Sequence, residues 1–90
     1  MSDTLRYFLT YRGAGLPLTL TEELAEADLR HRNTWFEARY DAAGRLIAID
    51  KRVYGETEMQ HRYDYDASGR LCRATVTLGD EAPLVREFPR

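Results

Sequence analysis

The residue types that most often do chemistry are scarce in this sequence. It contains two histidines, His31 and His61, and one cysteine, Cys72. No His-x-x-x-His pair, Cys-x-x-Cys pair or closely spaced set of loop carboxylates is present, so the sequence predicts no metal site. Ser68 has no Gly-x-Ser-x-Gly motif around it, and the glycines form no phosphate-binding loop. We therefore predict no catalytic residue and no cofactor.

His61 is the residue best suited to act as a general base. Alternation places it on the same face as Tyr63, the buried face of a strand, where a histidine most often serves as a hydrogen-bonded core residue. A base would need a carboxylate partner, but alternation places Glu58 and Asp64 on the opposite face. The alternative is a small enzyme or ligand-binding protein with a cleft between sheet and helix. The groups available to such a cleft are His61, Tyr63, Arg45 and Glu37.

Two further pairs of residues could bind a ligand or a partner. Arg45 and Arg70 occupy matching positions and could bind an anion, although pairing with a carboxylate or covering an aromatic ring is the commoner role. Trp35 and Tyr54 place aromatic rings on an otherwise polar face, where two exposed rings would suit a protein, a sugar or a base. Rings covered by other parts of the chain are the commoner outcome. The candidate binding residues are Trp35, Tyr54, Arg45, Arg70 and His61.

The elements that must position these residues are organised around a doubled stretch. Residues 40–46 read Tyr-Asp-Ala-Ala-Gly-Arg-Leu, and residues 65–71 repeat them as Tyr-Asp-Ala-Ser-Gly-Arg-Leu. Each copy predicts a hairpin turn. The Asp side chain can bond backbone N–H groups two residues on, and a Gly three residues later supplies a positive φ. The turn residues are Asp41, Gly44, Asp66 and Gly69.

Apolar residues recur at every second position on both sides of these turns, which is the period of a strand with one buried and one polar face. We predict a meander of four strands, at residues 34–40, 45–54, 56–65 and 70–78. Near the N-terminus, the odd positions of residues 5–12 are apolar and predict a strand with one strongly apolar face. Residues 13–15 then give a turn signal, and residues 16–21 predict a second strand that pairs back on the first. Pro17 puts this second strand at a sheet edge or at its own start.

A short helix is predicted around Glu23 to Arg30. Acidic residues at its beginning and basic residues at its end favour the helix dipole. We expect this helix to pack on the apolar face of the sheet. The predicted fold is therefore mainly β (α+β), a single bent antiparallel β-sheet of about five to seven strands, with a hairpin followed by a meander and one short helix. Residues 1–90 make one domain. Residues 80–90 form a loosely docked tail, or residues 84–88 add an edge strand.

Composition sets limits on function. The 90 residues carry a net charge of −2, so the overall basic footprint of a nucleic-acid-binding protein is missing. One cysteine excludes an internal disulfide framework. No apolar run approaches the ~20 residues that span a membrane, and no signal peptide is recognisable at the N-terminus. We therefore expect a cytoplasmic protein that binds no membrane.

The second copy of the doubled stretch, Tyr63-x-Tyr65-Asp66-x-x-Gly69-Arg70-Leu71, resembles the YD repeat of RHS-type bacterial proteins, which stack many such repeats into a shell around a toxin. The first copy departs from the pattern, because Ala38 stands where the first Tyr belongs. Two copies cannot enclose anything, so the resemblance implies strand–turn–strand architecture and not the function. The whole chain also resembles a family of short uncharacterised bacterial proteins, with counterparts of Tyr-Phe-Leu-Thr-Tyr and Arg-Asn-Thr-Trp-Phe. That resemblance implies no activity.

These observations favour a non-catalytic protein-interaction or binding module, which uses a sheet edge for a protein partner or for self-association. Homodimerisation is expected through an edge or through the region of Trp35 and Tyr54. One alternative is the ligand-binding protein or enzyme around His61. A second is single-stranded nucleic-acid binding, which the acidic balance counts against. A third is an accessory or immunity-like protein of a toxin or secretion system, which rests on the repeat resemblance alone.

Overall fold

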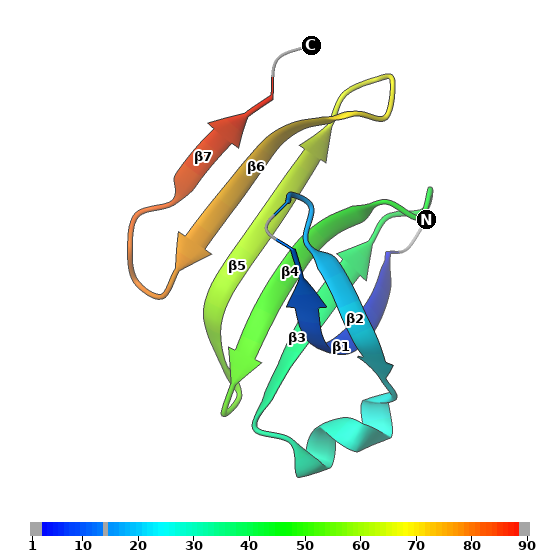
Figure 1. Ribbon diagram of the computed structural model, residues 1–90, viewed down its shortest axis with the longest axis vertical. Coiled ribbons are helices and arrows are strands. Elements are labelled where there is room, and N and C mark those ends of the chain that lie inside the picture. Colours follow the sequence, from blue (N-terminus) through cyan, green and yellow to red (C-terminus); the bar gives the residue numbers. More distant parts are fainter. Residues whose placement is uncertain (1–2, 14, 89–90) are drawn as a thin grey trace.

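The alternating segments form strands in the computed structural model, which describes residues 3–13 and 15–88. One antiparallel sheet of seven strands has the order β2-β1-β3-β4-β5-β6-β7 (Figure 1). Its elements are β1 (Thr4–Arg12), β2 (Thr19–Leu24), the 3-10 helix η1 (Glu26–His31), β3 (Thr34–Tyr40), β4 (Leu46–Val53), β5 (Glu56–Tyr65), β6 (Leu71–Leu78) and β7 (Leu84–Glu87). The predicted fold class, mainly β with a single antiparallel sheet, is confirmed. Ala14 of the predicted first turn lies outside the described residues.

The first Asp–Gly turn joins β3 to β4. Asp41 Oδ1 accepts the backbone N–H groups of Ala43 and Arg45, each at 2.9 Å. The Gly44 N–H donates to the Asp41 carbonyl at 2.9 Å, and Gly44 has a φ of 84°. Residues with a Cβ rarely adopt that conformation, which explains why a Gly stands three residues after the Asp.

The second turn joins β5 to β6 and repeats the first. Asp66 Oδ1 accepts the N–H groups of Ser68 at 2.9 Å and Arg70 at 3.0 Å. The Gly69 N–H donates to the Asp66 carbonyl at 3.0 Å. In both copies the strand register shifts just before the turn. The repeat in the sequence is therefore a repeat in the structure, a hairpin unit that occurs once at β3–β4 and again at β5–β6.

One face of the sheet carries the hydrophobic core. Its buried apolar residues are Phe8, Leu18, Phe36, Ala38, Ile49, Tyr63 and Ala74. Leu16 and Leu20 pack against the same cluster, so the chain leading into β2 covers this face. In Figure 1 the β1–β2 hairpin crosses over β3 and β4 at this place. The core is therefore closed by the sheet bending back over itself.

The prediction that the odd positions of β1 form its buried face is wrong. The buried residue is Phe8, which is 6% exposed and stands directly opposite Phe36 of β3. The register between β1 and β2 omits Leu9 and Glu22, and Glu22 has a φ of 59°. Beyond this irregularity the Tyr11 ring contacts the Phe36 ring edge-on, with centroids 5.5 Å apart. Pairing with β3 decides which face of β1 is buried, and local alternation does not reveal that pairing.

The predicted helix is also corrected. It begins at Glu26 rather than Glu23, because β2 continues to Leu24, and it is a 3-10 helix without a buried residue. Its first turn is held by the Ala25 N–H, which donates to Asp28 Oδ2 at 3.0 Å. Figure 1 shows η1 beyond the ends of β2 and β3. The helix therefore connects two strands, and the segment around Leu18 covers the core in its place.

The end of the described chain adds a strand to the sheet. β7 pairs with β6, and the Phe88 N–H donates to the Cys72 carbonyl at 3.0 Å. The Phe88 side chain packs against the core cluster. Of the two alternatives for this segment, the structure has the edge strand, one residue shorter than the predicted 84–88. Residues 89 and 90 lie outside the described part of the chain.

Candidate functional site

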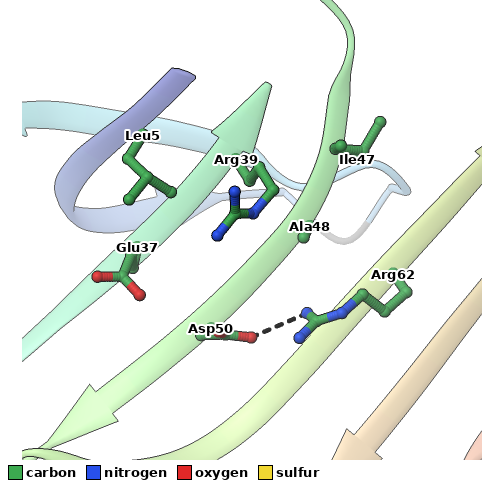
Figure 2. A pocket seen from close by; sticks show the side chains of 7 residues that line it. All are labelled: Leu5, Glu37, Arg39, Ile47, Ala48, Asp50 and Arg62. Atoms are coloured by element: carbon green, nitrogen blue, oxygen red, sulfur yellow. Dashed lines mark hydrogen bonds and ion pairs between the residues drawn. The ribbon is translucent and has the colours of Figure 1, made fainter. Parts of the chain in front are cut away.

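The polar face of the sheet has a hollow of about 210 Å³ over β3, β4 and β5, drawn in Figure 2. It is lined by Leu5, Glu37, Arg39, Ile47, Ala48, Asp50 and Arg62. Arg62 donates to Asp50 at 2.8 Å, the dashed line in Figure 2. Arg52 pairs with Glu37 at 3.1 Å and with Asp50 at 3.7 Å. The pairs Arg62–Asp50 and Arg52–Glu37 join β5, β4 and β3, whereas Arg52 and Asp50 belong to the same strand. The two cross-strand pairs have a structural role.

His61 and Tyr63 form a buried polar pair on the opposite, core face. His61 is 5% exposed and Tyr63 is 3% exposed. His61 Nδ1 lies 2.6 Å from the Tyr63 hydroxyl oxygen, which also accepts the Leu18 N–H at 3.2 Å. Both hydrogen bonds of the Tyr63 hydroxyl are made when it donates its proton to Nδ1 of a neutral imidazole and accepts the Leu18 N–H. The pair therefore connects β5 to the chain segment that covers the core.

Burial also sets the protonation of this pair. Desolvation lowers the pKa of His61 below its ordinary value. Desolvation raises the pKa of Tyr63 to about 12, although the Leu18 N–H acts in the opposite direction. Both shifts favour the neutral side chains that the hydrogen bonds require. A neutral, mutually bonded pair is a poor proton acceptor for a substrate, so this geometry favours a structural role.

The cleft considered from the sequence is brought together only in part. His61 and Tyr63 meet, but Glu37 lies on the opposite face in the ion pair with Arg52. Arg45 lies at the β3–β4 turn. There its Nε donates to Asp41 Oδ2 at 2.9 Å, and its guanidinium lies 5.3 Å from the Tyr65 ring centroid.

The two arginines at matching positions each follow an Asp–Gly turn. Arg45 has the contacts of the commoner, structural role, a carboxylate partner and an aromatic ring. The Asp41 pKa is lowered by the backbone N–H of Arg45 and, to a smaller extent, by its guanidinium. Arg70 is exposed and follows the second turn, where its N–H donates to Asp66 Oδ1. These contacts give no support for an anion bound jointly by Arg45 and Arg70.

The aromatic pair considered from the sequence is unequal. Tyr54 is 75% exposed at the β4–β5 turn, where Tyr54 and Gly55 have φ values of 50° and 81°. Two positive φ values are typical of a type I′ turn. Trp35 is half-buried, and its Nε1 is a buried nitrogen without a hydrogen-bond partner in the described part of the chain. A patch of two exposed rings is therefore not formed.

The outer edge of β7 is a feature that the candidate residues named from the sequence do not include. Because the Phe88 N–H bonds to β6, and hydrogen-bonding directions alternate along an antiparallel strand, Leu84 and Arg86 also face β6. The N–H and C=O groups of Val85 and Glu87 then point away from the sheet. Leu84 is 67% exposed and Val85 is 59% exposed. β7 is the last strand of the sheet (Figure 1). Its outer edge thus presents both backbone groups and apolar side chains.

The 25-residue spacing of the doubled stretch also separates β5 from β7. Tyr40 and Tyr65 are 25 positions apart in the sequence. The same separation relates Gln60 of β5 to Val85, and Arg62 to Glu87. The Gly79 N–H donates to the Glu58 carbonyl, so by the same alternation Gln60 and Arg62 bond to β6. The outward N–H and C=O groups of β7 therefore lie 25 residues after the β5 groups that bond to β6.

A second hollow, of about 260 Å³, lies beside β7 on the core face. It is lined by Val76, Leu78, Glu81, Ala82 and Leu84. Leu78 is 43% exposed, so the apolar surface continues from β7 on to β6. The core is covered at Leu18 but uncovered at this end of the sheet.

Neither a metal cluster nor a membrane-spanning helix is found among the described residues. Within residues 3–13 and 15–88, no three His, Cys, Asp or Glu side chains are grouped so that they could hold a metal ion. In that same part of the chain, no helix has the length and apolar character needed to cross a membrane.

Comparison with known proteins assigns the chain to a family. The chain belongs to a family of unknown function (DUF6156), whose model matches residues 1–89. No curated protein and no solved structure matches the chain. The family match is consistent with the resemblance to short uncharacterised proteins, and it gives no support for a YD repeat.

Proposed function

We propose that this protein is a protein-interaction module, which binds by accepting a β-strand at the outer edge of β7. The observation that carries the proposal is the row of outward N–H and C=O groups at Val85 and Glu87. Strand addition supplies hydrogen bonds to such a row, and neighbouring apolar side chains supply specificity. The equivalent groups of β5, at Gln60 and Arg62, are used in this way by β6.

The opposite edge of the sheet is less suited to strand addition. β2 is preceded by Pro17, contains the positive φ of Glu22, and is followed directly by η1. Such irregularities are typical of edges protected against pairing. β7 has four residues, a length that limits the contact area, so we expect weak and reversible binding.

The exposed side chains beside this edge add to the proposal. Leu84 and Leu78 border the hollow on the core face, and Val85 projects from the other face of the strand. An added strand would cover part of this apolar surface, at about 25 cal/mol per Å² removed from water.

The other hypotheses have weaker support. A ligand site around His61 would need a free base, whereas His61 and Tyr63 are buried and bonded to each other. An accessory or immunity-like role in a toxin system rests on the repeat resemblance alone. Neither hypothesis accounts for the edge of β7.

The test is affinity capture of the tagged protein from a lysate of its source organism, with wild type, Val85→Pro and Val85→Ala compared. Proline removes the outward N–H at residue 85, whereas alanine retains it and shortens the same side chain. We expect the bound protein to be retained by wild type and Val85→Ala and lost by Val85→Pro. Because the Val85 N–H does not bond to β6, Val85→Pro should remain folded by circular dichroism. Equal capture by a folded Val85→Pro variant would refute the proposal.

A further inference from the structure

We infer that the strand accepted by β7 is β7 of a second copy of this chain, in antiparallel two-fold pairing with Val85 opposite the partner's Val85. This inference rests on the proposed function and names its partner. In both copies the N–H and C=O groups of Val85 and Glu87 point away from the sheet, so each strand can donate hydrogen bonds to the other and accept them from it. A two-fold axis at the edge closes the contact between two copies and leaves no further β7 edge open.

The alternation of β7 restricts the possible registers. The outward residues Val85 and Glu87 must face outward residues of the second strand. Three registers do this, with 85 opposite 85, 85 opposite 87, or 87 opposite 87. Each register also fixes which side chains stand directly across from each other on the two faces.

Like charges separate these registers. Pairing 85 with 87 places Arg86 directly opposite the partner's Arg86. Pairing 87 with 87 places Glu87 directly opposite the partner's Glu87. Like charges in direct cross-strand positions are destabilising. Pairing 85 with 85 avoids both contacts, because Val85 meets valine and Arg86 stands across from the partner's Leu84.

The charged residues of β7 are already held within their own chain in a way that fits this register. The Arg86 guanidinium carbon lies over the Phe88 ring, 5.4 Å from its centroid, which holds this charge on the core face of β7. Glu87 pairs with Arg73 of β6 at 3.1 Å on the other face. In this register the Glu87 N–H faces the carbonyl of the partner's Pro83. That hydrogen bond uses only the proline carbonyl, so the lack of a proline N–H does not prevent it.

Cysteine cross-linking tests both the partner and the register. In a Cys72→Ala background, Val85→Cys, Arg86→Cys and Glu87→Cys variants would be oxidised under equal conditions, and disulfide-linked dimer would be followed with time. Directly opposed residues of a hydrogen-bonded pair have Cα atoms about 5.5 Å apart, within disulfide range. The 86–86 and 87–87 pairs would then lie at or beyond the diagonal spacing of about 7–8 Å, which is too far. We expect Val85→Cys to cross-link about tenfold faster than either other variant, given these separations.

The possible outcomes decide separately on the register, on the second copy as partner and on strand addition at β7. Faster cross-linking at residue 86 or 87, or equal rates at all three, would overturn the register. Sedimentation of the wild type as a monomer at millimolar concentration would overturn the second copy as partner. If Val85→Pro still abolished capture of another protein in that case, strand addition at β7 would stand with a different partner. If capture were also unaffected, both proposals would fall.

Discussion

The Tyr63 hydroxyl lies 2.6 Å from His61 Nδ1 while it accepts the Leu18 N–H at 3.2 Å. One buried oxygen thus joins a histidine in the middle of the sheet to the chain segment that covers the core. Because all three groups are removed from water, each depends on the others for its hydrogen bonds.

Tyr63→Phe removes this oxygen and leaves the Leu18 N–H and His61 Nδ1 without it. Leaving buried polar groups unsatisfied costs about 1–3 kcal/mol, so we expect a loss of that size in the free energy of unfolding, measured with urea. Tyr54→Phe is the matched control, because Tyr54 is 75% exposed and should change stability by less than about 0.5 kcal/mol. Equal effects of the two substitutions would contradict the role of the Tyr63 hydroxyl.

The stability of the protein should depend on pH through His61. Burial lowers the pKa of His61 in the folded protein, so below about pH 6.5 the unfolded chain binds a proton that the folded protein does not. The contribution of His61 to the free energy of unfolding is therefore complete above about pH 6.5. It is lost as the pH falls towards the pKa of His61 in the folded protein, by at most about 1.4 kcal/mol per pH unit. His61→Gln should reduce this slope, and His31→Gln, at an exposed position of η1, should leave it unchanged. The readout is urea unfolding from pH 7.5 to 5.

The two Asp–Gly turns can be tested by the same Gly→Ala substitution. Gly44 and Gly69 have φ values of 84° and 87°, and space is open where a Cβ would lie. Gly44→Ala and Gly69→Ala should therefore each destabilise the protein through backbone strain alone, by about 1 kcal/mol. Gly15→Ala also enters open space, without a positive φ, and should be close to neutral. Thermal unfolding compares the three variants, and a neutral Gly44→Ala would argue against the observed turn.

The buried face of β1 can be tested directly. Phe8 is 6% exposed in the core, whereas Leu5 is 43% exposed. Phe8→Ala should cost about 3–5 kcal/mol, as expected for a buried aromatic ring. Leu5→Ala should cost less than about 1 kcal/mol at its exposed position. A larger effect at Leu5, measured by urea unfolding, would support the face that local alternation predicts.

The sequence was informative where structure depends on local patterns. Period-two alternation and the Asp–Gly spacing were enough for the meander of β3 to β6 and for the position of both turns. The face of β1 depends on Phe8 pairing with Phe36, a contact between distant segments that alternation does not report. The start of η1 depended on how far β2 continues beside β1.

The candidate site residues were predictable only in part. His61 was placed on the buried face by its parity with Tyr63, and both are buried. Trp35 is half-buried, and its exposure depends on how the rest of the chain packs around it, which the alternation pattern of one strand does not report. An edge strand at residues 84–88 was one of the two alternatives for the last segment, but which of its residues face outward depends on its register with β6, which the sequence does not report.

Strand pairing at the edge of β7 is tested most directly by residue-resolved amide hydrogen exchange of β7 as the protein concentration increases. Leu84 and Arg86 bond to β6, so their amides should be protected at every concentration, within the stability of this edge strand. The Val85 and Glu87 amides should exchange fast in dilute protein and become protected at high concentration. Val85 and Glu87 amides that exchange equally fast at both concentrations would contradict strand pairing between two copies at this edge.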